Sequence, residues 1–196
     1  MASRKVKKKN FIIQYNAPVT LTFTLVCLFV LFLDFLTGGN STMKLFCVYR
    51  SELADPLTYV RLFTHVLGHA DFTHLTSNLV LMLVIGPSIE ERYGSGNICW
   101  AMVVTALVSG LIQCLLFPGT ALMGASGIVF MMIIMSSLGG MRGGIPITLI
   151  LVFVIYIGGE VYNGIIANDN ISQITHIVGG ICGAVMGIGM RIGRGR

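Results

Sequence analysis

The chain has 196 residues, of which 55% are hydrophobic and only 11% are charged, and its net charge is +5. A soluble globular domain carries about 25% charged residues. This composition excludes an ordinary soluble domain, a disordered tail and a nucleic-acid-binding module. The basic excess lies near the two ends of the sequence, at Arg4, Lys5, Lys7, Lys8, Lys9, Arg191, Arg194 and Arg196. We interpret these clusters as flanks of a membrane-embedded core.

Six stretches are apolar enough to cross a bilayer, for which about 20 residues are needed. They are roughly 17–36, 74–90, 97–117, 125–141, 145–166 and 172–190. The expected fold is therefore all-α: a polytopic membrane protein with six transmembrane helices. We expect one domain over 17–190, with basic segments at 1–16 and 191–196. The first stretch is too long for a removable signal peptide and lacks a small-residue cleavage site.

Lysine and arginine predict the orientation of these spans. With the N-terminus in the cytoplasm, ten of the 13 basic residues lie inside and three lie outside, namely Lys44, Arg50 and Arg61. This bias predicts cytoplasmic N- and C-termini. The long connection 38–73 is then outside and can lie partly in the membrane interface. The second, fourth and sixth spans run from outside to inside.

Four polar residues in or beside these spans stand out, because such residues are costly there and predict function. They are His74, Asn78, Ser126 and His176. Three of them lie 14, 16 and 15 residues before a basic residue at the inner boundary: Asn78 before Arg92, Ser126 before Arg142, and His176 before Arg191. At 1.5 Å per residue, these three share a layer about 21–24 Å above the inner boundary. His74 is one helical turn above Asn78.

The sequence around Ser126 favours a nucleophile. Gly124 and Ala125 precede it and Gly127 follows it, at the start of a short span. A helix N-terminus has free backbone N–H groups, which are suitable donors for an oxyanion. The side chains of Asn78 and His74 are further candidate donors. Glycines permit a tight turn and the close approach of a substrate.

His176 is the candidate general base for Ser126. It must be neutral to accept the serine proton. Gly179 and Gly183 lie one and two turns after it, and small residues at this spacing let helix backbones approach closely. We expect no acidic third member: Asp34 lies near the outer end of the first span, and Glu160, in the fifth, stays unexplained. The prediction is a Ser–His dyad.

Each of these residues also has an ordinary structural interpretation. A single serine, asparagine or histidine in a span is more often a packing residue. His65, His69 and His74 suggest zinc, but no H-E-x-x-H pattern is present, and we expect His65 and His69 to bond loop backbone. We therefore expect no metal and no cofactor. The odd number of cysteines, without a C-x-x-C pair, predicts packing residues. We expect Glu90, Glu91 and Arg92 to stabilise the inner end of the second span.

The motifs resemble those of the rhomboid intramembrane serine proteases. The similar segments are RLFTHVLGHADFTH at 61–74, then Asn78, followed by Glu90-x-Arg92-x-Gly94. Gly124-Ala125-Ser126-Gly127 resembles the GxSG nucleophile motif of the family. His176-x-x-Gly179-x-x-x-Gly183 resembles its last-span histidine motif. The match covers nearly the whole chain in the right order. The six-span form is similar to the minimal bacterial type, which suggests a prokaryotic plasma membrane.

The resemblance implies a serine endopeptidase with Ser126 as nucleophile and His176 as base. It also implies an oxyanion hole formed by the Ser126 N–H with Asn78 and His74. Substrates would be single-pass membrane proteins cut near the outer surface, entering past the fifth span and the loop before the sixth. Two positions depart from the family pattern. Val60 replaces a frequent tryptophan before Arg61, and Phe130 replaces a frequent tyrosine, although phenylalanine can still stack on His176.

Two other functions stay open at this stage. A catalytically silent relative would bind membrane proteins without cutting them. A small-solute transporter is disfavoured because the sequence has no inverted repeat and no paired broken helices.

Overall fold

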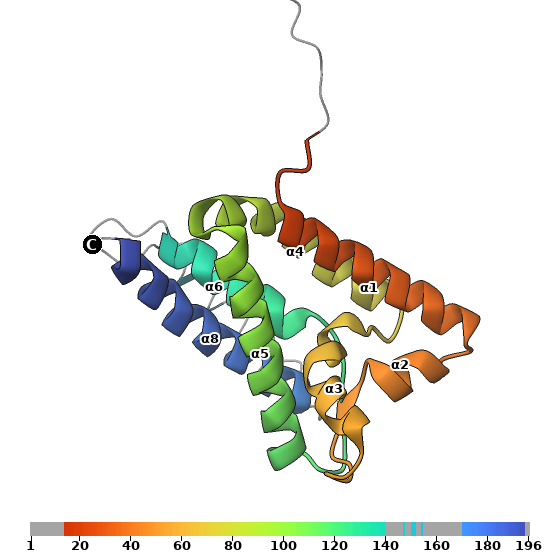
Figure 1. Cartoon of the computed structure of the whole chain (residues 1–196). Coiled ribbons are helices and arrows are strands. Elements are labelled where there is room, and N and C mark those ends of the chain that lie inside the picture. The colour runs from red at the N-terminus through yellow and green to blue at the C-terminus, as the bar shows by residue number, and fades with distance from the viewer. Residues whose placement is uncertain (1–13, 140–146, 148–149, 152–153, 155–169, 195–196) are drawn as a thin grey trace, which may run out of the picture.

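The computed structural model describes residues 14–139, 147, 150–151, 154 and 170–194. Ten elements are bounded there: α1 Pro18–Leu36, α2 Asn40–Leu45, β1 Val48–Tyr49, α3 Pro56–Thr64, the 3₁₀ helix η1 His65–Leu67, α4 Phe72–Tyr93, α5 Ser95–Leu116, β2 Ala121–Leu122, α6 Ser126–Gly139 and α8 Asn170–Arg194. In Figure 1, α6 and α8 lie side by side, and α1 lies along α4. Helix α4 also contacts α6, and α5 contacts α8.

Three described helices are long and apolar enough to span a membrane: α1, α4 and α5. Two further apolar helical stretches, Ser126–Gly139 and Ile174–Met190, are shorter. Helices thus occur at five of the six predicted stretches. The predicted span 145–166, which contains Glu160, falls almost entirely outside the described residues. The number of six spans therefore stays a prediction.

Helix α4 is longer than its predicted range of 74–90. It begins earlier because Asp71 caps it, with the carboxylate accepting the N–H of His74 at 2.7 Å. Asp71 is a preferred N-cap residue. The helix ends at Tyr93, because Gly94 has a φ of 87°, a conformation that glycine adopts readily.

The connection 38–73 is more ordered than the sequence suggests. It contains α2, β1, α3 and η1, and α3 is capped by the Asp55 side chain. Strand β1 pairs antiparallel with β2, so that Val48 lies opposite Leu122. Because β2 lies four residues before Ser126, this ribbon ties the connection to the loop that leads into α6. The two strands are a small addition to the expected all-α fold.

Arg61 holds this connection together from within. Its side chain is buried, donates from Nε to the carbonyl oxygen of Lys44 at 2.9 Å, and pairs with Asp55 at 3.3 Å. The guanidinium also lies 4.6 Å from the ring centroid of Tyr49, which is a cation–π distance. The arginine that follows Val60 is thus buried and bonded to two separate parts of the connection.

The start of α1 is fixed by a residue from the far end of α4. The buried carboxylate of Glu90 accepts the backbone N–H groups of Val19 and Thr20 at 2.9 and 3.0 Å, and the Thr20 hydroxyl at 2.8 Å. A helix N-terminus leaves such N–H groups without intrahelical partners, and a carboxylate there is stabilised by the helix dipole. Glu90 therefore has a structural role, as we expect for Glu90, Glu91 and Arg92: it joins the inner end of α4 to the start of α1.

The five cysteines are all free, and Cys27, Cys47 and Cys182 are buried. The sequence predicts packing residues at these positions, and the three buried cysteines fit that role. Cys99 differs from the others, because it is exposed on α5.

Candidate active site

Ser126 is the first residue of α6, directly after an irregular stretch that follows β2. Gly124 in this stretch has a φ of 123°, which L side chains rarely adopt. A Cβ placed on Gly124 would lie 2.8 Å from Cε1 of His74 and 2.9 Å from its Nε2. Only glycine therefore permits both this turn and the position of the histidine. Gly124 thus lies against a side chain of α4.

Two histidines of the 38–73 connection, His65 and His69, accept hydrogen bonds from the loop before Ser126. The N–H of Gly124 donates to the carbonyl oxygen of His65 at 3.0 Å. The N–H of Ala125 donates to Nε2 of His69 at 3.4 Å. His69 Nδ1 in turn lies 3.2 Å from the carbonyl oxygen of Leu67. This pattern requires a neutral His69 with its proton on Nδ1.

Burial keeps both of these histidines neutral. It lowers the pKa of His65 to about 4 and that of His69 to about 4. His65 Nδ1 lies 3.1 Å from the carbonyl oxygen of Arg61, and its Nε2 lies 3.3 Å from the Ser109 hydroxyl. The expectation that His65 and His69 bond backbone is confirmed. Their ring nitrogens thus contact protein groups. This arrangement fits a role in holding the loop before Ser126 better than it fits metal coordination.

His176 lies at the contact between α6 and α8. Its ring is stacked on that of Phe130, with centroids 4.4 Å apart and planes 7° apart. Phe130 is four residues after Ser126, so the two residues share one face of α6. The serine and the histidine therefore lie on the facing sides of two helices in contact. His176 is buried, and Ser126 is half-buried.

Glycines set the distance between these two helices. A Cβ on Gly179 would overlap the carbonyl oxygen of Gly127, and a Cβ on Gly183 would overlap that of Met131. A Cβ on Gly127 would lie 3.1 Å from Cγ2 of Thr175. The backbones thus approach closely in the turns that follow Ser126 and His176. On the opposite face, α8 exposes an apolar stripe at Ile177, Ile181, Val185 and Ile188.

Asn78 and His74 lie on α4 beside the loop that precedes Ser126. The His74 ring is half-buried against Gly124 and makes an edge contact with His69, at a centroid distance of 5.1 Å. Asn78 is buried and donates from Nδ2 to the carbonyl oxygen of His74 at 3.1 Å. A side-chain amide carries two N–H donors, so this bond leaves Asn78 with a further donor.

A sequence model of the Rhomboid domain matches residues 56–192, well over half of the chain. The chain belongs to the rhomboid family. The match begins at the first residue of α3 and ends within α8, so that it includes every candidate site residue named above. Rhomboids are in general intramembrane serine proteases, and the apolar helices of this chain fit an integral membrane protein.

One contact of this rhomboid's site was not predicted from the sequence. The sequence predicted that His69 bonds loop backbone. It did not predict that the partner is Ala125, 56 positions away in the chain and directly before the candidate nucleophile. The β1–β2 ribbon had no signal beyond two short apolar runs. The candidate gate, at the fifth predicted span and the loop after it, lies outside the described residues.

Proposed function

We propose that this rhomboid is an intramembrane serine endopeptidase that cuts transmembrane segments of single-pass membrane proteins near the outer face of the membrane. The observation that carries the proposal is the stack of Phe130 on His176. It supports a base at His176 that faces the side of α6 that begins with Ser126. Substitution of Ser126 and of His176 distinguishes an active protease from a silent relative.

The proposed reaction begins when the Ser126 hydroxyl attacks the carbonyl carbon of the scissile peptide bond. His176 takes the hydroxyl proton as the new C–O bond forms, and the carbonyl oxygen becomes an oxyanion. The C–N bond then breaks, and the leaving amine receives the proton from His176. Water attacks the resulting ester, with His176 again as base. This step releases the carboxylate product and restores Ser126.

The proposed oxyanion hole combines backbone and side-chain donors. The N–H of Ser126 belongs to the first turn of α6, where N–H groups have no intrahelical acceptor. Asn78 and His74 approach the same loop from α4. Loss of one such donor lowers kcat about 10²–10³-fold. The bonds from the loop to His65 and His69 pre-organise these donors, since they fix the backbone directly before Ser126.

The proposed topology places the site within reach of water. The basic residues predict cytoplasmic ends, and the start of α6 then faces the outer side. Irregular backbone such as that around Gly124 is tolerated at membrane depth only where it is buried in protein or lines a wet cavity. Hydrolysis inside the bilayer requires such a hydrated cavity.

The test uses the purified full-length protein in detergent with a single-pass reporter substrate and a fluorophosphonate probe. We expect the wild type to cleave the reporter and to be labelled, and Ser126→Ala to lose both. His176→Ala should lose cleavage as well. Ser137→Ala is the matched control, because Ser137 lies on the same helix and its hydroxyl bonds only the carbonyl oxygen of Ile133 among the contacts described.

If the wild type neither cleaves nor is labelled, the protease proposal is wrong. Persistent binding of the uncut reporter, independent of Ser126, would then identify a silent membrane-protein binder.

A further inference from the structure

His69 is a fully buried histidine that takes no part in the proton transfers proposed for Ser126 and His176. It lies between η1 and the start of α4. Its Nδ1 lies 3.2 Å from the carbonyl oxygen of Leu67, which fixes the ring on its own segment. The rest of the ring makes two contacts with other parts of the chain, one with Ala125 and one with His74. Each contact leads to a different donor of the proposed oxyanion hole.

The contact with Ala125 leads to the backbone donor. The N–H of Ala125 donates to Nε2 of His69 at 3.4 Å, and the carbonyl oxygen of Ala125 accepts the N–H of Val129 at 2.9 Å. This carbonyl and the N–H of Ser126 belong to the same planar peptide unit. Because Ala125 is bonded on both sides, the direction of the Ser126 N–H is fixed. Without His69, the buried N–H of Ala125 would lose its acceptor.

The contact with His74 leads to the side-chain donor. The two imidazole rings meet edge to face, with centroids 5.1 Å apart and planes 68° apart. The His74 ring also lies against Gly124, and its backbone N–H donates to the Asp71 carboxylate at 2.7 Å. Asp71 thus fixes the backbone of His74, whereas His69 and Gly124 restrict its ring.

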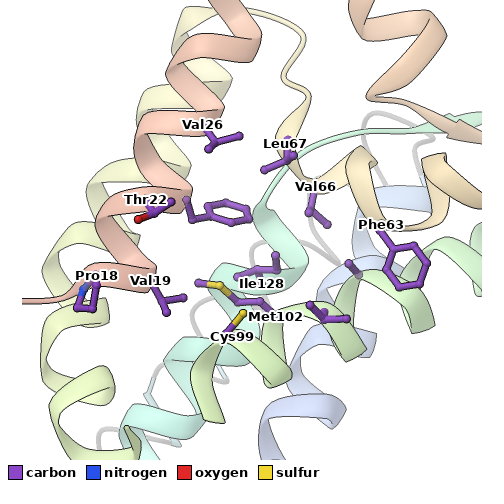
Figure 2. A pocket seen from close by; sticks show the side chains of 13 residues that line it. Pro18, Val19, Thr22, Val26, Phe63, Val66, Leu67, Cys99, Met102 and Ile128 are labelled. Carbon is purple, nitrogen blue, oxygen red and sulfur yellow. The ribbon is translucent and has the colours of Figure 1, made fainter. Parts of the chain in front are cut away.

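The segment that carries His69 is itself held firmly. Val66 and Leu67 line an apolar pocket together with Ile128 of α6, two residues after Ser126 (Figure 2). A Cβ on Gly68 would overlap the carbonyl oxygen of Phe46, so the backbone directly before His69 packs closely on the rest of the connection 38–73. His69 therefore has a fixed support from which to orient other groups.

We propose that His69 is a positioning residue of the oxyanion hole, and that it orients both the N–H of Ser126 and the ring of His74. The inference rests on the proposed function, since only catalysis requires these donors to be oriented. It also distinguishes His69 from His65. The bond from Gly124 to His65 uses the main-chain carbonyl oxygen, which does not depend on the His65 side chain.

Two substitutions separate the contacts of His69. His69→Phe keeps an aromatic ring beside His74 but cannot accept the N–H of Ala125, whereas His69→Gln keeps an acceptor oxygen and loses the ring. The purified full-length variants are compared by reporter cleavage and by the rate of fluorophosphonate labelling. We expect His69→Phe to lower kcat at least about tenfold, since loss of a whole oxyanion donor costs about 10²–10³-fold. His69→Gln should lower kcat up to about tenfold, the value of an aromatic contact. KM should change less than about twofold, because the donors act on the transition state.

A second background tests whether the ring of His69 acts through His74. In His74→Ala the ring edge has no partner, so adding His69→Gln should lower the labelling rate by less than about twofold. Adding His69→Phe should still lower it at least about tenfold, because the contact with Ala125 does not involve His74. If His69→Phe does not fold, the pair His69→Gln and His74→Ala still tests the second contact.

Glu90→Gln is the control for stability. Glu90 lies 16 residues after His74 on α4, about 24 Å away, and caps α1. Thermal unfolding in detergent is measured for every variant, and cleavage is assayed below all the transitions. Glu90→Gln should lower the unfolding temperature and leave kcat unchanged, so that loss of stability alone does not imitate loss of a positioning residue.

Three results would overturn the proposal. They are a wild-type kcat in both variants at position 69, a loss of kcat that Glu90→Gln reproduces at equal loss of stability, and an undiminished effect of His69→Gln in the His74→Ala background. Failure of the proposed function gives a different result, because the wild type itself is then neither active nor labelled. The role of His69 as a positioning residue would be refuted with it.

Discussion

The ring of Phe130 lies flat against the ring of His176, with the two planes 7° apart. This stack joins the second turn of α6 to α8 and fixes the orientation of the imidazole. A histidine between two helices otherwise has freedom about two side-chain bonds. The two stacked residues are 46 positions apart in sequence, and Phe130 lies one helical turn after Ser126. Aromatic packing thus contributes to the positioning of the proposed base.

Phe130→Ala should lower kcat for the reporter by up to about tenfold and change KM little. Stacked aromatic pairs contribute about 0.5–1.5 kcal/mol beyond the area that they bury. Their loss frees the imidazole without removing a reacting group. Phe130→Tyr keeps the ring and should retain most of the activity. Steady-state cleavage kinetics measure the effect, with Phe29→Ala on the exposed face of α1 as control. Equal kcat values for Phe130→Ala and the wild type would contradict this role.

Gly179→Ala should abolish cleavage and lower the free energy of unfolding by about 1–3 kcal/mol or more. Its Cβ would overlap the carbonyl oxygen of Gly127, so the backbones of α6 and α8 must separate, and overpacking of this kind is destabilising. Titration with a denaturing detergent measures the stability. Reporter cleavage measures the loss of activity that is expected when Ser126 and His176 move apart.

Gly189→Ala is the matched control on the same helix. Nothing lies within 4 Å of a Cβ at this position, so the change should leave activity intact and stabilise α8 by up to about 1 kcal/mol. The same loss in both variants would mean that helix contact is not the cause.

Apolar length and glycine spacing in the sequence predicted the helices of this fold and one of their contacts. Apolar length identified α1, α4 and α5 within a few residues, and the glycine spacing of α8 indicated a close helix contact. The turn at Gly124 was indicated by the glycine, but the partner that requires it, His74, comes from another helix. Likewise, the bond from Ala125 to His69 depends on how η1 and the residues after it lie against the start of α6, which no local periodicity encodes.

The stability of the protein should fall as the pH is lowered from about 6.5 to about 4. The folded-state pKa values of His65 and His69 are about 4, against an ordinary value of 6.5. Between these limits the unfolded chain binds protons that the folded chain does not, so the free energy of unfolding decreases as the pH falls. Above pH 6.5 both histidines are neutral in either state, and their contribution is fully present. Thermal unfolding in detergent at a series of pH values measures this slope.

His69→Gln identifies the group responsible. The glutamine oxygen can still accept the N–H of Ala125, but it does not titrate in this range. We expect the slope between pH 6.5 and 4 to fall without vanishing, because His65 still contributes. His74 and the Asp71 carboxylate lie beside His69 and are unchanged in this variant. An unchanged slope would assign the pH dependence to other groups.

Glu90→Ala should destabilise the protein by about 3 kcal/mol, since it leaves the N–H groups of Val19 and Thr20 and the Thr20 hydroxyl without their carboxylate partner. Glu90→Gln should cost less, because one amide oxygen can still accept. Glu91→Ala is the control: Glu91 is exposed, and its replacement should change the free energy of unfolding by less than about 0.5 kcal/mol. Denaturant titration measures all three. Equal effects at positions 90 and 91 would show that α1 is held by apolar packing on α4 and not by its cap.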